Sequence, residues 1–267
     1  MEATFKDQVI WITGASSGIG EALAYALSAE GAKLILSSRR VAELERVKNN
    51  CQYPDQVQLF PLDLLDSASL EAKVPAVIAL FGRIDVMVHN GGISQRALVA
   101  ETDIAVHREV MELNYFSYII LTKALLPHFI TRGSGHFVVT SSVMGKIGTP
   151  MRAAYAAAKH ALHGYFDCLR AEVSSSGIKV TILTPGYIHT PIAVITGDGG
   201  RMQGKSEQIN GGFPAEKAAA QIVKAIKRGA YEPYIGKPAG QERLALLINR
   251  VWPSLLIRLM PKMGAPK

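Results

Sequence analysis

The sequence contains little that points to an extracellular, metal-binding or secreted protein. Among its 267 residues there are only two cysteines, Cys51 and Cys168, and their spacing matches neither a disulfide framework nor a zinc site. We therefore expect no metal, and a reducing, cytoplasmic compartment is the default. The N-terminal residues MEATFKDQ contain no apolar run, so we expect neither a secretory signal nor an anchor at that end.

Other features that are missing exclude further classes of protein. No linker rich in Pro, Gly or Ser divides the chain and no internal repeat is present, so we expect a single domain over residues 1–267. The formal net charge is +7, but no basic run carries interleaved aromatic residues, so nucleic-acid binding is not expected. Hydrophobic residues make up 48% of the chain, which is ample for a buried core.

The N-terminal region is typical of a nucleotide-binding strand–helix–strand unit. A short apolar run, Val9 to Thr13, predicts a buried strand, and an apolar stripe at helical spacing predicts the helix that follows. The turn between them reads G-x-x-x-G-x-G, from Gly14 to Gly20. Such a turn lets the backbone approach a pyrophosphate at the N-terminus of the helix. Its spacing differs from the commoner G-x-G-x-x-G, so the turn alone does not identify a family.

Apolar runs and helical patterns alternate along the rest of the chain. This alternation predicts an α/β fold of the Rossmann type, a doubly wound parallel sheet with helices on both faces and ligands at the carboxyl ends of the strands. The predicted strands cover residues 8–13, 33–37, 57–61, 84–88, 135–140, 178–183 and 231–235. The predicted helices cover residues 18–30, 40–50, 67–82, 102–131, 152–175 and 214–229.

Tyr155 and Lys159 lie four residues apart in a predicted helix, which puts the phenol and the ammonium on one face. A cation beside a phenol favours the phenolate, and lowering the phenol pKa by about three units requires about 4 kcal/mol from neighbouring cations. Ser142, thirteen residues before Tyr155, adds a hydroxyl that can hold a substrate oxygen. Most Tyr–Lys pairs at this spacing only pack, so the interpretation depends on the glycine turn at the other end of the chain.

Together these motifs resemble the short-chain dehydrogenase/reductase family. The order and spacing match from about Lys6 to Tyr234. The resemblance rests on TGASSGIG, Asn90-Gly-Gly, Asn114, Ser142, the Tyr155 and Lys159 pair, and Pro185-Gly186. The stretches GYFDCLRAEV and PGYIHT resemble, within that family, the branch of hydroxysteroid dehydrogenase-like and member-7-like reductases. A homodimer or homotetramer is expected.

The resemblance implies a catalytic set of Asn114, Ser142, Tyr155 and Lys159. It makes Tyr155 the general acid/base and Ser142 the residue that holds the substrate oxygen. Lys159 is then expected to hold the ribose of a nicotinamide cofactor, and Asn114 to kink its helix and hold a water that links the lysine to solvent. From the residues alone, Asn114 is only a polar side chain in an awkward place, the middle of a predicted helix.

The end of the second predicted strand favours NADP(H) as the cofactor. NAD-binding folds usually have an acidic residue there, but this sequence reads Ser37-Ser38-Arg39-Arg40. A guanidinium binds a 2′-phosphate through paired charged hydrogen bonds. We therefore expect Arg39 to be the main residue that binds this phosphate, with Ser38 or Arg40 making additional contacts. The alternative is that the arginines only solvate the end of the strand. The resemblance extends the cofactor-binding set to Gly14, Ser16, Ser17, Gly18, Ile19, Gly20, Asp63, Leu64, Asn90, Gly91, Gly92, Pro185, Gly186, Ile188 and Thr190.

We therefore expect an NADP(H)-dependent oxidoreductase that interconverts a carbonyl and a secondary alcohol by hydride transfer. The pocket for a hydrophobic small-molecule substrate is expected to be lined by Met144, Ile147, Met151 and Tyr187, beside Ser142 and Tyr155. A polar, glycine-rich segment over about 187–213 is expected to form a substrate lid. The alternative is a catalytically silent nucleotide sensor or scaffold, against which the intact catalytic set argues.

A C-terminal amphipathic extension, about residues 240–267, goes beyond the common family core. Its apolar stretch from Leu244 to Met260 is interrupted by Arg250 and Arg258, which makes it a poor transmembrane span. Three alternatives remain: the extension covers the substrate cleft, pairs with another subunit, or lies on a membrane surface as a peripheral contact. We favour packing or subunit contact over the membrane, although the positive charge suits an anionic bilayer.

Overall fold

Seven parallel strands form the central sheet of the protein, as the alternating pattern predicts. The computed structural model describes residues 5–202 and 212–262. The strands lie in the order β11-β7-β6-β4-β1-β2-β3, and every neighbouring pair is parallel. The strands are β1 (Val9–Thr13), β2 (Lys33–Ser37), β3 (Val57–Leu59), β4 (Val86–His89), β6 (Gly135–Thr140), β7 (Ile178–Pro185) and β11 (Tyr234–Ile235). The order reverses between β1 and β4, which is where ligands bind in such sheets.

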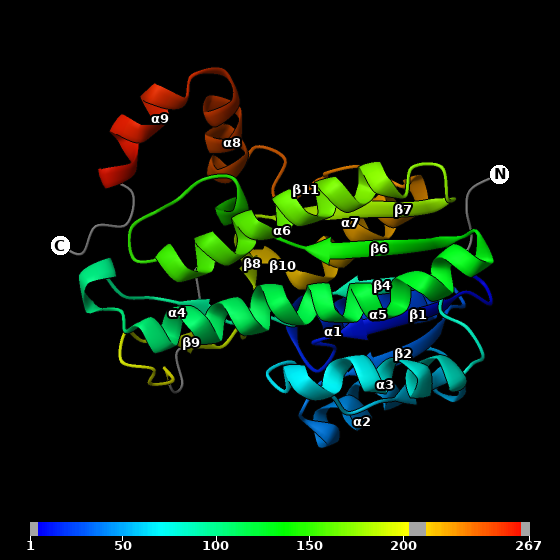
Figure 1. Cartoon of the computed structure of the whole chain (residues 1–267). Helices are drawn as coiled ribbons and strands as arrows, with labels where there is room; N and C mark the ends of the chain where they lie inside the picture. Colours follow the sequence, from blue (N-terminus) through cyan, green and yellow to red (C-terminus); the bar gives the residue numbers. More distant parts are fainter. Residues whose placement is uncertain (1–4, 203–211, 263–267) are drawn as a thin grey trace.

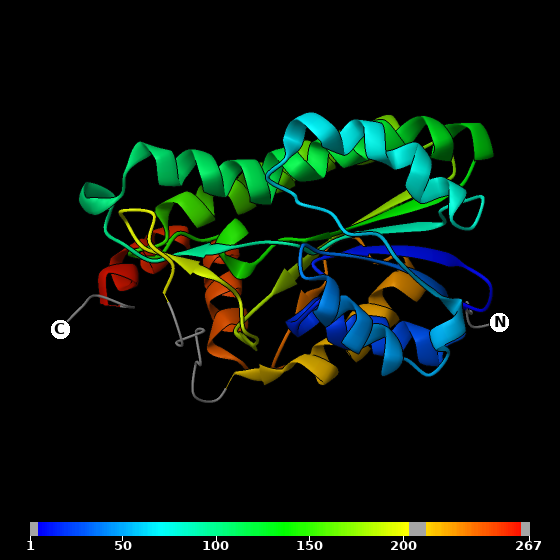
Figure 2. The same cartoon turned by 90° about the horizontal axis from the view of Figure 1, so that it is seen from below.

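Helices cover both faces of this sheet (Figures 1 and 2). One face carries α1 (Gly18–Ala29), α2 (Val41–Asn49) and α7 (Ala215–Arg228), and the other carries α3 (Ser67–Ala79), α4 (Ile104–Met111), α5 (Ser117–Arg132) and α6 (Ala153–Glu172). Strand β1 contributes to both cores, because successive side chains of a strand point to opposite faces. Trp11 packs in the core beneath α5 and α6, whereas Ile10 and Ile12 pack against α1 and α7.

The helix predicted over 102–131 is interrupted at Asn114. Helix α4 ends at Met111, a π-helical turn, η3, spans Glu112–Phe116, and α5 begins at Ser117. The Asn114 side chain is fully buried and holds the backbone of Ile93: its Nδ2 donates to the carbonyl at 2.8 Å, and its Oδ1 accepts from the amide at 2.9 Å. Turns of this kind are frequent at functional sites. The interruption therefore ties the helix to the loop that follows β4.

The segment after β7 is held to the rest of the fold by two small two-stranded sheets. One pairs β8 (Ile188–His189) with β10 (Phe213–Pro214), and the other pairs β5 (Ser94–Gln95) with β9 (Val194–Ile195). The expected lid over about 187–213 includes these pairings, and its residues 203–211 lie outside the described residues.

Two C-terminal helices, α8 (Gln241–Val251) and α9 (Pro253–Leu259), lie at one edge of the molecule (Figure 1). Ala245 and Leu256 are buried against Ile147, and Leu246 packs in a cluster that contains Tyr155. The inner side of the extension therefore packs beside the cleft, while its residues 263–267 lie outside the described residues. Over residues 5–202 and 212–262, no helix has the length and apolar character needed to span a membrane.

Asp85, just before β4, connects three segments. Its carboxylate accepts from the Val9 amide at 2.8 Å and pairs with Arg83 at 3.0 Å and Arg132 at 2.7 Å. Burial raises the pKa of this carboxyl, but the Val9 amide and the two guanidinium groups together outweigh it and hold the pKa below its usual range.

We expect Asp85→Asn to lower the free energy of unfolding by about 1–3 kcal/mol at pH 7, because a neutral amide leaves two arginines without their carboxylate. Since the folded pKa lies below the unfolded value of about 3.9, this stabilisation is present above pH 4 and is lost as the pH falls through the folded pKa. Urea unfolding at pH 7 and pH 3 measures it, with the exposed Asp55→Asn as control. An equal penalty at both pH values would contradict the assignment.

Candidate active site

A cavity of about 420 Å³ opens at the carboxyl ends of the parallel strands. It brings together residues that are separated by most of the length of the chain. The predicted residues in its walls are Gly14, Ser16, Ser17, Gly18, Ile19, Ser38, Arg39, Arg40, Asp63, Leu64, Asn90, Gly91, Gly92, Ser142, Met144, Tyr155, Lys159, Pro185, Gly186, Tyr187, Ile188 and Thr190. Four predicted residues are not in the walls: Gly20, Asn114, Ile147 and Met151.

The glycine turn after β1 is a place of close backbone approach. Gly14 has a φ of 65°, in the left-handed region, and a Cβ there would lie 2.5 Å from the Cα of Gly91. A Cβ on Gly20 would lie 2.3 Å from the Gly14 carbonyl oxygen, so Gly20 packs behind the turn instead of lining the cavity. The absence of side chains at these positions leaves the turn and the N-terminus of α1 open to an anionic ligand.

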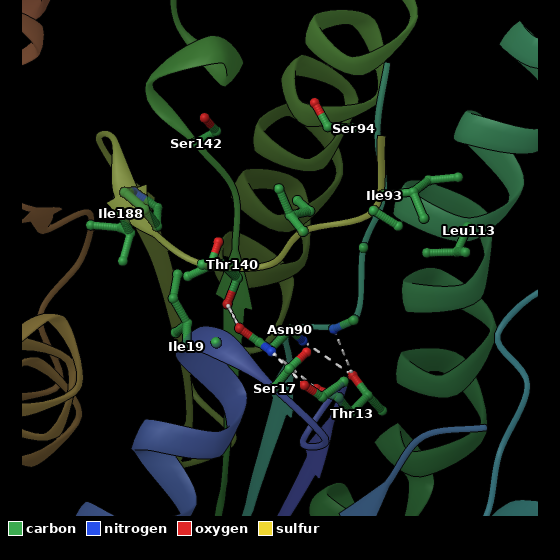
Figure 3. Close-up of a pocket in the computed structure, with 18 of the residues that line it drawn as sticks. Thr13, Ser17, Ile19, Asn90, Ile93, Ser94, Leu113, Thr140, Ser142 and Ile188 are labelled. Atoms are coloured by element: carbon green, nitrogen blue, oxygen red, sulfur yellow. Dashed lines mark hydrogen bonds between the residues drawn. The ribbon is translucent and has the colours of Figure 1, made fainter. Parts of the chain in front are cut away.

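Asn90 connects the ends of three strands (Figure 3). Its amide N–H donates to the Thr13 hydroxyl at 3.1 Å, and its Nδ2 donates to the Gly14 carbonyl at 3.3 Å. Its Oδ1 accepts from the Thr140 hydroxyl at 3.5 Å. The ends of β1, β4 and β6 are therefore fixed to one another beneath the cavity. Thr13 and Thr140 are not among the predicted site residues, because a threonine at the end of a strand carries no distinctive signal.

The side chains of the two arginines after β2, Arg39 and Arg40, make different contacts. The Nη2 of Arg40 donates to the hydroxyls of Ser16 and Ser17, each at 2.9 Å, so this guanidinium is held against the glycine turn. Arg39 is exposed at the cavity wall and makes no hydrogen bond or ion pair with another residue that the structure describes. The geometry thus assigns the two residues separate places: Arg40 is part of the turn, and the Arg39 guanidinium is available to a ligand.

Lys159 is a buried cation, only 3% exposed. Its Nζ donates to the Thr140 carbonyl at 2.7 Å and lies 5.4 Å from the centre of the Tyr118 ring. No carboxylate among the described residues forms an ion pair with it. Burial lowers the pKa of Lys159 to about 7. A ligand that adds hydrogen-bond acceptors around Nζ would favour the charged form.

Tyr155 lies one turn before Lys159 on α6, with the Lys159 Nζ 5.7 Å from the centre of its ring. The fall in phenol pKa expected from the sequence does not occur in the chain alone. Burial raises the pKa of Tyr155, and the Ser142 hydroxyl and the charge of Arg152 offset this only in part. The reason is that the phenolate loses hydration, while the lysine ammonium is directed to the carbonyl of Thr140.

Ser142 begins the turn after β6, where its Oγ accepts from the Met144 amide at 3.1 Å. The neighbouring Ser141 hydroxyl is engaged elsewhere, at 2.9 Å from the Nε2 of His163 and 3.2 Å from the Lys159 carbonyl. The Nδ1 of His163 lies 3.7 Å from the Glu232 carboxylate. Ser141 is therefore engaged with His163 and the backbone of Lys159, whereas the Ser142 hydroxyl is the one that acts on the Tyr155 phenol.

Arg152 and Ser94 belong to the cavity wall, although the sequence did not single them out. The Nη1 of Arg152 donates to the Ser94 hydroxyl at 2.5 Å and to the Gln95 carbonyl at 3.2 Å. Burial lowers the pKa of this guanidinium. The available signal was proximity in the sequence, since Arg152 lies three residues before Tyr155, at the N-terminal end of α6.

Two residues expected to contact substrate lie elsewhere. Met151 adopts a φ of 66°, and its carbonyl accepts from the Ala97 amide at 3.2 Å, so the turn before α6 is joined to a neighbouring loop and this residue is not in the cavity wall. Ile147 packs against Ala245 and Leu256 of the C-terminal helices. A left-handed turn at a methionine and a contact across a hundred residues are not visible in a local sequence pattern.

Comparisons with known proteins agree with this geometry. The model of the short chain dehydrogenase family matches residues 8–198. A Drosophila melanogaster protein, dehydrogenase/reductase SDR family protein 7-like, is 42% identical over 264 residues, which are 96% of this chain and 80% of that protein. A solved short-chain dehydrogenase from Streptomyces avermitilis is 32% identical with a TM-score of 0.81, covering 94% of this chain and 96% of that one.

A variant of the actinorhodin polyketide ketoreductase, solved with NADPH, is 31% identical with a TM-score of 0.66, covering 71% of this chain and 74% of that one. The family match and the relatives confirm the resemblance predicted from the motifs, including its narrower form. The chain belongs to the short-chain dehydrogenase/reductase family of oxidoreductases, in the branch of the member-7-like proteins.

Proposed function

We propose that the protein is an NADP(H)-dependent oxidoreductase that interconverts a carbonyl and a secondary alcohol, with Tyr155 as the general acid/base. One observation carries the proposal: Ser142, Tyr155 and the buried Lys159 share a cavity with the glycine turn. One end of this cavity suits a dinucleotide and the other suits proton transfer. The silent-scaffold alternative is not favoured, because every side chain of the catalytic set is held in or directly behind the cavity.

The residues present fit a nicotinamide dinucleotide phosphate. The glycine turn leaves backbone room for a pyrophosphate, and Arg39 would hold the 2′-phosphate beside the fixed guanidinium of Arg40. Residues 38–40, directly after β2, include no carboxylate that would repel that phosphate. Lys159 would hold the ribose next to the nicotinamide, and Thr190 the carboxamide or phosphate. The similar ketoreductase solved with NADPH supports this choice of cofactor.

The residues of the protein contribute a proton transfer to the reaction, in a site that is largely shielded from water. When bound, the nicotinamide cofactor supplies or accepts the hydride, and its oxidised ring adds positive charge to the cavity. Tyr155 would give a proton to the substrate oxygen in reduction and remove it in oxidation. Ser142 accepts from the Met144 amide, so its own proton can be donated to the same oxygen, which is worth about 3 kcal/mol in comparable sites.

Asn114 would act indirectly, through a water molecule that it shares with Lys159. A Cβ on Gly92 would lie 3.2 Å from the Oδ1 of Asn114 and 3.8 Å from the Nζ of Lys159, so glycine keeps a small space between these two polar groups. We place the proposed relay water in that space, since it offers polar partners on two sides. Asn114 itself is kept in position by its two hydrogen bonds to Ile93.

The cavity that holds Ser142 and Tyr155 also has the apolar side chains of Val143, Met144 and Ile192 in its walls. This favours a hydrophobic ketone or aldehyde. The described part of the segment expected as a lid contributes Tyr187, Ile188 and residues 190–193 to the walls, which supports its role in enclosing the substrate. We also propose that the protein forms a homodimer or a homotetramer, and sedimentation velocity tests this oligomeric state.

We expect Tyr155→Phe to lower kcat by about 10²–10⁴-fold, because the phenylalanine ring cannot transfer a proton. The assay follows NADPH oxidation with a carbonyl compound found by screening the wild-type protein, and cofactor affinity is measured separately. Tyr165→Phe, on the same helix but outside the cavity, is the matched control. Turnover by the Tyr155→Phe variant at the wild-type rate would contradict the assigned role.

We expect Arg39→Ala to weaken NADPH binding by about 10–100-fold and to leave NADH binding unchanged, because only NADPH carries the phosphate that the guanidinium holds. Titration with each nucleotide, followed by nicotinamide fluorescence, measures both affinities. The control is Arg46→Ala, which removes a cation that pairs with Glu21 and Glu43 away from the cavity. Equal affinity of the wild-type protein for the two nucleotides would rule out this basis for cofactor choice.

We expect Gly14→Ala to abolish dinucleotide binding, whereas Gly91→Ala should change it by less than about threefold. At Gly14 the added Cβ meets backbone and φ is positive, but at Gly91 the closest atom is the end of the Leu64 side chain, at 2.5 Å, which can move. Fluorescence titration and thermal unfolding of both variants provide the comparison. A Gly91→Ala protein that loses binding as completely as Gly14→Ala would show that the space at position 91 is essential.

A further inference from the structure

The outer sides of α8 and α9 carry an apolar surface that nothing in the described part of the chain covers. It consists of Leu244, Leu247, Val251, Trp252 and Ile257, each more than half exposed. The spacing of the first three puts them in one stripe along α8. Sixteen large apolar side chains of the described residues are exposed, and six of them fall between residues 244 and 259. This concentration differs from the scattered apolar residues of an ordinary surface.

Cations accompany this α8–α9 apolar surface. Arg243, Arg250 and Arg258 are exposed on the same two helices, and none forms an ion pair with another described residue. The one carboxylate of these helices, Glu242, is turned towards the body of the protein, where it accepts from the Tyr187 amide at 3.3 Å. The outward side of the extension therefore combines apolar side chains with positive charge and no outward carboxylate of its own.

We propose that the α8–α9 apolar surface docks on a bilayer that contains anionic lipids. Short amphipathic helices with aromatic and aliphatic residues on one side and arginines beside them lie in the headgroup region, with the apolar side chains in the acyl boundary. Trp252 suits that boundary because its ring is apolar and its N–H is polar. The arginines would meet lipid phosphates, and their positive charge would strengthen binding to an anionic surface.

A second copy of the chain is the main competing occupant, and charge disfavours it. In a twofold dimer the same surface meets itself, so the arginines of one copy would face those of the other. Like charges at an interface oppose association, and the two helices offer no outward carboxylate that could pair with them. An anionic bilayer supplies the missing opposite charge.

The inner side of the same helix contacts the proposed catalytic region. Leu246 packs in a cluster with Tyr155 and Met144, and Glu242 holds the Tyr187 backbone. Docking would therefore bring the substrate cleft close to the bilayer, from which an apolar carbonyl compound can enter. This consequence for substrate supply rests on the proposed function, whereas the docking itself does not.

Trp252 provides an intrinsic fluorescence probe of the α8–α9 apolar surface. The only other tryptophan, Trp11, is fully buried, so acrylamide quenching reports on position 252. The full-length chain is mixed with vesicles of phosphatidylcholine alone or of phosphatidylcholine with phosphatidylserine. We expect co-sedimentation with the mixed vesicles, a blue shift of the emission and protection from acrylamide, all reduced by high salt.

Ile257→Glu is expected to weaken vesicle binding by at least about tenfold, and Leu247→Glu likewise, because a charged side chain would have to enter the acyl boundary. The matched control is Ile104→Glu on α4, since Ile104 is 65% exposed and Ile257 is 70% exposed. Thermal unfolding checks that each variant is folded. Binding unaffected by both surface variants, or lost equally in the control, would overturn the proposal.

Two further outcomes would also overturn it. One is a wild-type protein that does not sediment with anionic vesicles. The other is a dimer in sedimentation velocity that Ile257→Glu abolishes without any vesicle binding, which would assign the surface to a second copy. Vesicle binding is measured without substrate or cofactor, so its failure is distinguishable from failure of the proposed oxidoreductase activity.

Discussion

The hydrogen bond from the buried Lys159 ammonium to the Thr140 carbonyl is the contact on which the site depends. At 2.7 Å it joins α6 to the end of β6, and the Thr140 hydroxyl in turn contacts Asn90. Through Asn90 the loop after β4 and the glycine turn after β1 are fixed to the same point. A single carbonyl is poor compensation for a buried charge, which is why the pKa of Lys159 falls to about 7.

Because both sides of the cavity are tied to this point, a nucleotide bound at the glycine turn would share one fixed framework with the residues proposed for proton transfer. Helix α6 presents Tyr155 and Lys159 on one face, Arg152 lies just before its first turn, and the strand ends present backbone groups to the same cavity. Burial disfavours the phenolate of Tyr155 and the ammonium of Lys159 alike in the chain alone. Groups that a ligand brings into the cavity would restore the charged forms, so the site is completed by what it binds.

Most of the architecture could be predicted from the sequence, because apolar periodicity and glycine turns are local signals. The seven strands and the sheet with helices on both faces follow from them, and the motif spacing identifies the family. The π-helical turn at Asn114 could not be derived from periodicity, since it depends on contacts with Ile93 across the fold. The contact of Arg152 with Ser94 and the left-handed turn at Met151 were missed for the same reason. A lowered phenol pKa is expected for Tyr155 beside Lys159 and a bound cationic nicotinamide ring; in the chain alone burial raises that pKa, and burial cannot be read from helical spacing.

The most direct test of this account is the titration of the Lys159 ammonium, followed by ¹⁵N NMR of lysine-labelled protein and assigned with Lys159→Arg. We expect a midpoint near pH 7 in the free protein, because the charge is buried with one carbonyl for a partner, and an upward shift when NADPH, whose nicotinamide ring is neutral, is added. A midpoint near the ordinary value of 10.5 in the free protein would contradict it, because the charge would then be solvated and would need no ligand to complete its environment.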